Sequence, residues 1–347
     1  MIEVSSISYK AGKFSLKDIS FNVEKGENLV ILGPTGAGKT VLLELIAGFR
    51  EVKTGSIKID GKEMVRLPPD KRKVGIVYQD YLLFPHLDVY ENIRYGLRGS
   101  GLSRSLIDSQ VKEVAKQIGI YYLLNRKTKR LSGGEQQRVA LARTMILEPD
   151  VLLLDEPFSA VDPNTKEKLM REMLKIIEPR NIPVIYVTHD QMEALEMADR
   201  IAVMSEGAFV QLDTPDQVFN APKSEFVANF VGIKNILKGQ SRKENGTSVI
   251  EIGGAQVHSS TVLEGDVYVT IRPEDIILSK QRLESSARNN LKGNVKSISE
   301  KGPIIYVTAD CGFELTASVT RQAFKELQIT VGDYVFMTFK APSVNAF

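Results

Sequence analysis

The sequence contains very little cysteine. Among its 347 residues there is a single cysteine, Cys311. One thiol excludes a disulfide bond within the chain, and it excludes a metal cluster held by several cysteines. Because free cysteines are among the most frequently buried residues, we expect Cys311 to be a buried structural thiol in a reducing compartment.

Long hydrophobic runs are also missing. No apolar run approaches the ~18–20 residues that a helix needs to cross a bilayer, and the longest, at 29–32, 151–154 and 184–187, have the length of strands. The first residues, Met1 to Ser5, lack the basic and apolar regions of a secretory signal peptide. We therefore expect a cytoplasmic protein, and any membrane pore with which it works must be another polypeptide.

The sequence has no excess of charge of one sign. Lys and Arg total 45 while Asp and Glu total 43, so the net charge is +2. This balance argues against a nucleic-acid-binding surface, which normally carries a basic excess. Apolar residues make up 43% of the chain and charged residues 25%, as in ordinary soluble globular proteins. At this length we expect two domains.

Residues 1–232 have the pattern of an α/β domain. Short apolar runs alternate with helical patterns, which predicts a largely parallel sheet covered by helices. The runs at 29–32, 151–154, 184–187 and 201–204 are predicted core strands, and 163–177 is a predicted helix with Asp162 as its N-cap. The pattern is almost wholly helical from about 88 to 147, which predicts a helical subdomain.

Residues 236–347 have a different character. Strand-like runs at 267–271, 304–308, 313–317 and 334–340 are separated by Gly, Asp and Asn turns. Several short strands with little helix predict a small all-β barrel of the OB-like kind. The intervening segment 220–232 keeps the apolar residues Phe226, Val227 and Phe230, so we expect a docked helix there and not a loose tether.

A glycine-rich loop follows the predicted strand at 29–32 and opens a predicted helix at 41–47. Its glycines let backbone N–H groups turn toward phosphate, and the helix N-terminus adds a favourable dipole. Lys39 would reach the β- and γ-phosphates of ATP, and Thr40 would offer a hydroxyl to Mg²⁺. The loop is a complete P-loop, predicting a P-loop NTPase that binds ATP through Gly33, Pro34, Thr35, Gly36, Ala37, Gly38, Lys39 and Thr40.

Polar residues follow three predicted strands. Asp155 and Glu156 follow 151–154, His189 follows 184–188, and Gln79 follows 75–78. In open α/β sheets the carboxyl ends of the strands face the ligand crevice. Asp155 is therefore an expected Mg²⁺ partner, and Glu156 would orient or deprotonate the attacking water. Gln79 would bind Mg²⁺ or that water, and His189 would contact the γ-phosphate, although a lone histidine is more often a structural group.

Residues 131–138, Leu-Ser-Gly-Gly-Glu-Gln-Gln-Arg, resemble the signature motif of the ABC ATPases. Ser132 and two glycines precede a helix that we predict to begin near Glu135, so the motif is a second anion cradle. Tyr9 is similar to the aromatic residue that stacks on adenine in this family. Residues 159–162, Ser-Ala-Val-Asp, resemble the D-loop, with Val161 where the family more often has leucine.

The resemblance covers the first 230 or so residues and implies partners. In the ABC family the signature motif of one subunit completes the ATP site of another, which implies a homodimer. Segments 81–86 and 91–93 resemble the region of importer ATPases that docks a coupling helix of the permease. The resemblance thus implies an ATP-hydrolysing subunit at the cytoplasmic face of the membrane, working with permease subunits and, indirectly, a substrate-binding protein. The residues implied to bind ATP in trans are Ser132, Gly133, Gly134 and Gln136.

The C-terminal domain resembles the regulatory barrels of ABC importers. Segment 267–275 is similar to those of importers for sugars, polyamines, ferric iron, sulfate and molybdate, and 286–293 more selectively resembles the opening of molybdate-binding barrels. The resemblance implies molybdate or tungstate uptake with feedback by internal oxyanion. The sequence departs from that family at Ala323 and Pro342, where a serine is usual, and both changes remove hydroxyl donors. The candidate oxyanion contacts are Ser286, Ala287, Arg288, Thr320, Lys340 and Ser343.

Three other interpretations remain open. The same machine could carry another solute, such as sulfate, ferric iron, a polyamine or a sugar. A soluble ABC ATPase of DNA repair or translation usually has tandem cassettes or long coiled-coil insertions, and neither is evident. A cytosolic oxyanion-binding regulator is disfavoured by the intact P-loop and the lack of a DNA-reading helix-turn-helix pattern.

Overall fold

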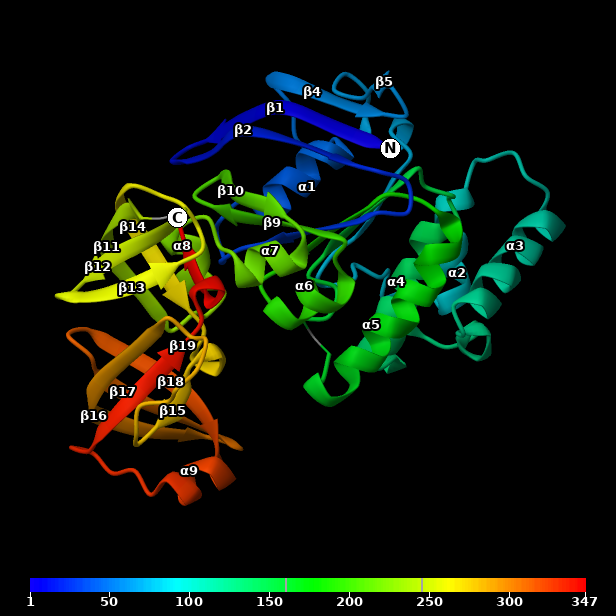
Figure 1. Cartoon of the computed structure of the whole chain (residues 1–347). Helices are drawn as coiled ribbons and strands as arrows, with labels where there is room; N and C mark the ends of the chain where they lie inside the picture. The colour runs from blue at the N-terminus through cyan, green and yellow to red at the C-terminus, as the bar shows by residue number, and fades with distance from the viewer. Residues whose placement is uncertain (160, 245) are drawn as a thin grey trace. The chain divides into compact units, whose positions relative to one another are not determined.

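The structure, a computed structural model, describes residues 1–159, 161–244 and 246–347 (Figure 1). It forms two compact units, Met1–Pro215 and Asp216–Phe347. The sequence pattern suggested a boundary at 232–236, so the second unit includes more of the intervening segment than we expected. Each unit has a hydrophobic core of its own.

A six-stranded sheet forms the centre of the first unit. Five of its strands are parallel, and β10 is added antiparallel at one edge. The central strands are largely apolar and almost entirely buried, as expected for a sheet with helices on both faces. In spatial order the strands are β10 (Ala208–Asp213), β9 (Arg200–Ser205), β3 (Asn28–Leu32), β8 (Val184–Thr188), β7 (Val151–Asp155) and β6 (Val74–Val77).

A second, antiparallel sheet of the first unit was not predicted. In β1 the buried residues are Ile2 and Val4 and then Ile7, so the inward-facing side chains change from even to odd positions. The register shifts between Val4 and Ile7, and Ser6 has a φ of 50°. Such a bulge breaks the two-residue alternation by which a strand is recognised. The strands, in order, are β2 (Phe14–Val23), β1 (Ile2–Ala11), β4 (Thr54–Ile59) and β5 (Lys62–Glu63).

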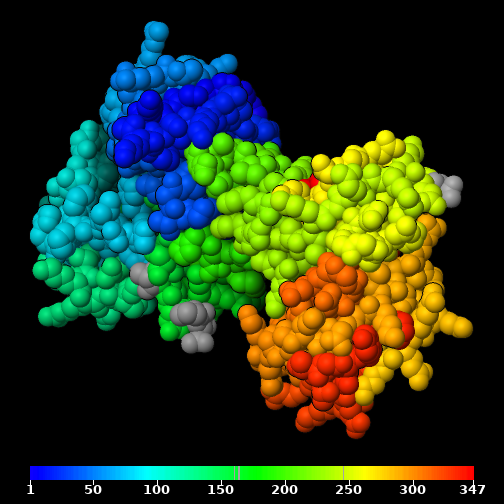
Figure 2. Space-filling view, turned by 90° about the vertical axis from the view of Figure 1, so that its left-hand side faces the viewer, coloured from blue at the N-terminus to red at the C-terminus, as the bar shows by residue number. Residues whose placement is uncertain are grey.

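The helices of the first unit follow the predicted plan. α1 (Lys39–Ala47) ends at Gly48, and α5 (Pro163–Ile177) has the predicted bounds. The helical block forms one flank of the unit (Figure 2), although three short 3-10 turns and connecting loops interrupt it. The helices of this block are α2 (Val89–Arg94), α3 (Arg104–Gln117) and α4 (Gly133–Met145), and outside the block α6 (Gln191–Met197) follows β8. The 3-10 turns of the whole unit are η1 (Pro69–Lys71), η2 (Tyr95–Leu97), η3 (Tyr121–Leu123), η4 (Thr128–Arg130) and η5 (Glu178–Arg180).

The second unit contains two five-stranded antiparallel sheets. The runs predicted at 267–271, 304–308, 313–317 and 334–340 coincide with β14, β17, β18 and β19 to within a few residues. One sheet has the order β13 (Ala255–Ser259), β12 (Thr247–Ile252), β11 (Asn235–Glu244), β14 (Gly265–Ile271), β20 (Val344–Ala346); the other has β15 (Ile277–Ser279), β19 (Tyr334–Phe339), β16 (Asn289–Lys301), β17 (Ile304–Asp310), β18 (Glu314–Thr320).

Short helices complete the second unit, and one side chain joins its sheets. The docked helix expected at 220–232 is two helices, α7 (Pro215–Asn220) and α8 (Glu225–Phe230). Buried Asn235 of β11 donates to the carbonyls of Ile271 and Thr316, both at 2.9 Å, and accepts from the Thr316 N–H at 2.7 Å. These bonds tie the two sheets together. The remaining elements are α9 (Arg321–Leu327), η6 (Pro273–Asp275) and η7 (Ala341–Ser343).

Candidate nucleotide site

The P-loop connects β3 to α1, in the order predicted from the sequence. Gly33 packs against β9 so closely that a Cβ atom there would lie 2.3 Å from the Met204 carbonyl oxygen. Gly38 has a φ of 109° and precedes α1, whose N-terminus has no side-chain cap among the described residues. The first N–H groups of this helix are therefore suited to an anion.

Lys39 lies folded against the loop. Its ammonium group donates to the carbonyls of Gly33 at 2.7 Å and Pro34 at 3.0 Å, and only 6% of the residue is exposed. Burial lowers the pKa of Lys39, and the carboxylates of Glu156 and Asp155 partly oppose this effect. A phosphate in the cleft would compensate a charge that is otherwise poorly solvated.

Thr40 and Asp155 bring two hard oxygen ligands together. The Thr40 hydroxyl donates to Asp155 Oδ1 at 3.3 Å, and burial raises the pKa of the Asp155 carboxyl. A hydroxyl and a desolvated carboxylate fit a divalent cation, and Mg²⁺ usually completes its shell with water and phosphate oxygens. In the described part of the chain, no group of three or more His, Cys, Asp or Glu side chains is arranged to hold a metal ion.

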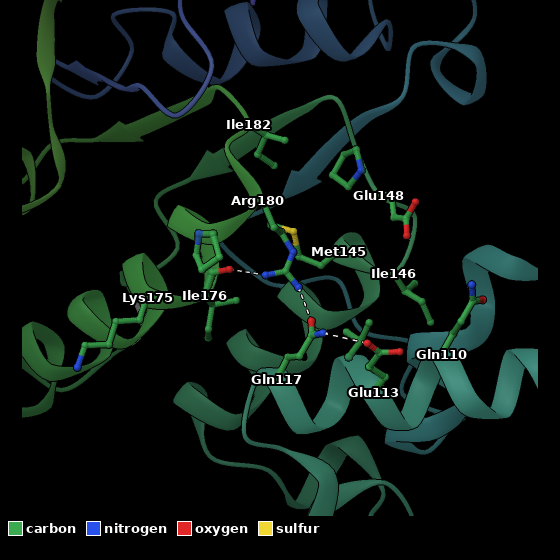
Figure 3. A pocket seen from close by; sticks show the side chains of 13 residues that line it. Gln110, Glu113, Gln117, Met145, Ile146, Glu148, Lys175, Ile176, Arg180 and Ile182 are labelled. Atoms are coloured by element: carbon green, nitrogen blue, oxygen red, sulfur yellow. Dashed lines mark hydrogen bonds between the residues drawn. The ribbon is translucent and has the colours of Figure 1, made fainter.

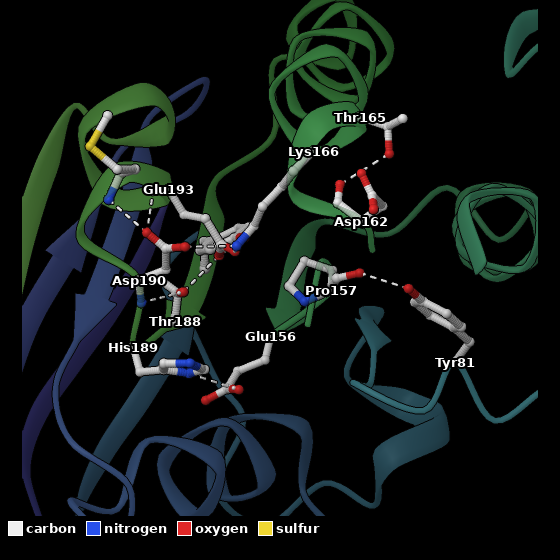
Figure 4. A network of polar contacts seen from close by, with 12 residues as sticks. Tyr81, Glu156, Pro157, Asp162, Thr165, Lys166, Thr188, His189, Asp190 and Glu193 are labelled. Carbon is white, nitrogen blue, oxygen red and sulfur yellow. Dashed lines mark hydrogen bonds and ion pairs between the residues drawn. The ribbon is translucent and has the colours of Figure 1, made fainter. Parts of the chain in front are cut away.

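Glu156 and His189 meet at the rim of the same cleft (Figure 4). His189 Nδ1 lies 3.0 Å from Glu156 Oε2. Glu156 has a φ of 45°, and its N–H donates to the Val187 carbonyl at 2.9 Å, so the backbone fixes its place after β7. Gln79 borders this cleft of about 560 Å³, together with Phe14, Glu156, His189 and most of the P-loop.

A buried polar network behind His189 was missed by sequence reasoning. Lys166 of α5 donates to Asp190 at 2.7 Å and also pairs with Glu193. Glu193 is 3% exposed and accepts hydrogen bonds from the hydroxyls of Tyr186 at 2.5 Å and Thr188 at 2.6 Å. Asp190 also caps α6. The only sign of this network in the sequence is Glu193, which comes three residues after Asp190, and this spacing of carboxylates is typical of the start of a helix.

The signature segment starts α4. Ser132 is the N-cap in a reciprocal capping box: its hydroxyl accepts from the Glu135 N–H at 3.3 Å, and Glu135 accepts from the Ser132 N–H at 2.8 Å. The helix begins at Gly133, earlier than the predicted start near Glu135, so both glycines lie in its first turn. The Gln136 side chain donates to the Leu131 carbonyl at 3.2 Å.

The signature segment borders a cleft of its own, of about 540 Å³. Ser132, Gly133 and Gly134 line it with Val161 and Asp162 of the D-loop-like segment. Ala160 of that segment lies outside the described residues. The described residues that line this cleft and those that line the P-loop cleft do not overlap. One chain thus presents two separate clefts.

Tyr9, which the resemblance implied to stack on adenine, contacts Arg50 in this structure. Its hydroxyl accepts from Arg50 at 3.1 Å, and the Arg50 guanidinium lies 5.8 Å from the centre of its ring. As far as the described residues go, the aromatic ring that lines the P-loop cleft is Phe14. Phe14 lies in the unpredicted antiparallel sheet, which is why sequence reasoning did not single it out.

Most of the candidate oxyanion contacts gather at one end of β16. Its first residue, Asn289, pairs with Phe339, so Arg288 and Lys340 occupy neighbouring positions just beyond that pair. The remaining candidates at this end directly precede Arg288 or lie in η7, which follows Lys340; they are Ser286, Ala287 and Ser343.

Thr320 lies at the other end of that strand. It pairs with Ile304, which pairs with Lys301, the last residue of β16. The strand has 13 residues, which corresponds to roughly 40 Å. The Thr320 hydroxyl caps α9 by accepting from the Ala323 N–H at 3.2 Å. Thr320 and Arg288 therefore lie at opposite ends of this strand.

A larger hollow, of about 710 Å³, lies at the opposite edge of the central sheet (Figure 3). Its lining includes Pro149 and Ile182, which precede β7 and β8, so it faces the amino ends of the strands. Arg180 bridges this hollow by donating to the side chain of Gln117 at 2.9 Å. Nucleotide chemistry is expected at the carboxyl ends instead.

Two protein families match parts of the chain. The family described as ABC transporter matches residues 16–159, and the TOBE domain family matches residues 285–346. The chain is also similar to a solved structure of CbiO1 from Clostridium perfringens, described as part of the ABC transporter complex CbiONQ. That similarity has a TM-score of 0.58 and 31% sequence identity, and it covers 63% of this chain and 90% of the other.

Curated relatives match over most or all of the chain. The chain is 43% identical to the molybdate/tungstate import ATP-binding protein of Pyrococcus abyssi over 100% of both chains. It is 41% identical to that of Thermococcus kodakarensis over 87% of this chain and 92% of the relative. A spermidine/putrescine import ATP-binding protein of Bacteroides thetaiotaomicron is 42% identical over 90% of this chain and 67% of the relative. The chain therefore belongs to the family of ABC import ATP-binding proteins, ATP hydrolases coupled to transport.

Proposed function

We propose that this chain hydrolyses ATP to drive the import of molybdate or tungstate through a separate permease. The observation that carries the substrate assignment is the alignment with the Pyrococcus abyssi molybdate/tungstate import protein, which spans all of both chains. It includes the second unit, where the candidate oxyanion residues lie.

The P-loop cleft is the proposed catalytic half-site. Lys39 and the N–H groups of α1 bind the phosphates, an assignment supported by the partly uncompensated charge of Lys39. Thr40, Asp155 and Gln79 would hold Mg²⁺, which when bound would neutralise charge on the phosphates. Glu156 takes the proton of the attacking water. His189 contacts the γ-phosphate, supported by its place beside Glu156 at the rim.

The second half-site acts on the nucleotide of a partner copy. Ser132, Gly133, Gly134 and Gln136 face the γ-phosphate held by the other chain, whereas Tyr9 or Phe14 packs against the base of the nucleotide in the P-loop cleft of its own chain. The proposal is supported by the two clefts, which have no described residue in common. Substitution of Glu156 by Gln should leave an ATP-bound dimer that light scattering detects, and full turnover by this variant would refute the role of Glu156.

The second unit is a proposed oxyanion sensor. Arg288 and Lys340 supply cationic donors at one end of β16, and Thr320 lies at the other end in the same chain. A site that uses all three requires two copies. Bound oxyanion would join the second units of the two chains and lower ATP turnover. Titration of the full chain with molybdate should show binding, and Arg288→Ala should abolish it; equal binding by both proteins would refute the site.

The proposed location is the cytoplasmic face of the membrane, with the permease as direct partner and a substrate-binding protein as indirect one. Within the described residues, no helix is long and apolar enough to cross a bilayer. The pore must then come from other chains. The test is uptake by vesicles that contain the reconstituted transporter: molybdate should enter only with ATP, and ATP-independent or absent uptake would refute the assignment.

A polyamine importer is the second candidate. It is favoured by the 42% identity to the Bacteroides thetaiotaomicron spermidine/putrescine relative, which is close to that of the molybdate/tungstate relatives. The same vesicles separate the two solutes, which carry opposite charge. ATP-dependent accumulation of labelled spermidine, with no accumulation of molybdate, would favour the second candidate.

A further inference from the structure

The segment that follows Gln79 has an unusual backbone. Tyr81 has a φ of 55° and Leu82 a φ of 45°, so two consecutive residues with side chains lie in the left-handed region. Such residues persist only where the surrounding contacts hold them. The Leu82 side chain is 55% exposed, whereas Tyr81 is 3% exposed. The segment turns one side chain to solvent and its neighbour into the core.

Arg143 of α4 holds this turn. Its guanidinium donates to the carbonyls of both left-handed residues, at 2.9 Å to Tyr81 and 2.7 Å to Leu82. It also lies 5.3 Å from the centre of the Phe84 ring. Burial lowers the pKa of Arg143. The helix that starts at the signature segment therefore fixes the backbone of residues 81 and 82.

Tyr81 connects this turn to the catalytic rim. Its hydroxyl donates to the Pro157 carbonyl at 3.0 Å in a buried hydrogen bond (Figure 4). Pro157 directly follows Glu156, whose own φ is 45°. Burial raises the pKa of the Tyr81 hydroxyl, so it keeps the proton that it donates. One buried hydrogen bond thus joins the turn to the peptide next to Glu156.

We propose that Tyr81 is a positioning residue, which holds the Glu156 carboxylate in place by anchoring Pro157. The turn at 81–82 has an exposed face at Leu82 and is fixed from behind by Arg143. A shift of that turn moves the Tyr81 hydroxyl and, with it, the peptide after Glu156. The turn thereby controls hydrolysis without touching nucleotide. This inference rests on the proposed role of Glu156.

The first test is the steady-state ATPase activity of the full chain. Tyr81→Phe keeps the buried ring and removes only the hydroxyl. We expect kcat to fall about 10-fold, since small displacements of a catalytic group are costly, and KM for ATP to stay within about two-fold because Tyr81 is away from the P-loop. Tyr306→Phe, the same change in the second unit, should leave both constants unchanged. A kcat of Tyr81→Phe equal to that of the unmodified chain would overturn the proposal.

A double variant separates positioning from a general loss of structure. If Tyr81 acts through Glu156, then Tyr81→Phe should not reduce further the residual turnover of Glu156→Gln. An additional 10-fold loss would overturn the proposal. Arg143→Lys cannot donate to the carbonyls of Tyr81 and Leu82 in the same way, so it should lower kcat and leave KM unchanged. This variant gives a second measurement if Tyr81→Phe does not fold. Full turnover by Glu156→Gln alone would refute the proposed role of Glu156, a separate outcome.

Discussion

Lys39 has contrasting roles with and without nucleotide. Its ammonium group is nearly buried, and burial lowers its pKa. The charged form of Lys39 is therefore unfavourable in the folded chain until an anion binds beside it. Lys39→Met should leave the thermal midpoint of the nucleotide-free chain within about 3 °C and abolish its increase by MgATP. Differential scanning fluorimetry with and without MgATP measures both. The exposed Lys13→Met is the control, and a retained MgATP shift in Lys39→Met would contradict the prediction.

Cys311 gives a pH dependence with a definite sign. Burial raises the pKa of this thiol from 9.0 to about 11. The unfolded chain therefore loses the proton first as the pH rises, so folding stability should fall between pH 9 and 11. The loss should be roughly 2–3 kcal/mol.

The difference between the unmodified chain and Cys311→Ala isolates this contribution from other groups that titrate in the same range. Urea unfolding at pH 8 and pH 10.5 measures it. Equal pH dependence in both proteins would refute the prediction. The thiol should also resist iodoacetamide at pH 8 until the chain is unfolded.

At the level of secondary structure, Arg72 secures the C-terminus of α1. This arginine is 3% exposed, and it donates to the carbonyls of Leu45 at 2.8 Å and Ile46 at 3.0 Å, as well as to those of Val65 and Leu67. Helix ends leave such carbonyls without partners.

Removing this arginine should destabilise the first unit. Arg72→Met removes a donor from four carbonyls, of which that of Leu45 still accepts from the Gly48 N–H, and we expect a loss of about 2–4 kcal/mol. Urea unfolding followed by circular dichroism measures the loss. Arg66→Met, a change at an exposed arginine, should alter stability by less than about 0.5 kcal/mol. Similar losses in the two variants would show that Arg72 does not stabilise the helix end.

Helices, strands and loops could be predicted from the sequence where the pattern that identifies them lies within one contiguous segment. The P-loop, the buried parallel strands and the helix at 163–177 are contiguous patterns, and the structure confirms them. β1 could not be recognised because its bulge at Ser6 shifts the alternation. Phe14, Lys166 and Tyr81 entered the site only through contacts with residues distant in sequence. A single sequence does not show such contacts.

For the whole molecule, the two separate clefts lead to a complementation test. Lys39→Met damages only the P-loop half-site. Ser132→Asp keeps a residue that caps α4 well but brings a negative charge toward the partner's γ-phosphate. Each variant alone should be inactive.

An equal mixture of the two variants should recover about a quarter of the unmodified ATPase activity, because half of the randomly formed pairs have one intact site. ATPase assays of the mixture measure this recovery. A mixture of Lys39→Met with Glu156→Gln, which damages the same half-site, is the control and should stay inactive. No recovery in the first mixture would contradict the paired arrangement.

The N-terminus of α1, which has no side-chain cap among the described residues, also provides a way to measure how much of the P-loop cleft holds nucleotide. Because no described side chain takes the first N–H groups of this helix, no side-chain hydrogen bond protects them from exchange when phosphate is absent. Their amide hydrogens should exchange with deuterium quickly in the free chain and slowly with ATP. The rate of deuterium uptake by this one turn would then report, without a chemical tag on the protein or the nucleotide, how much of the protein in a membrane preparation holds nucleotide.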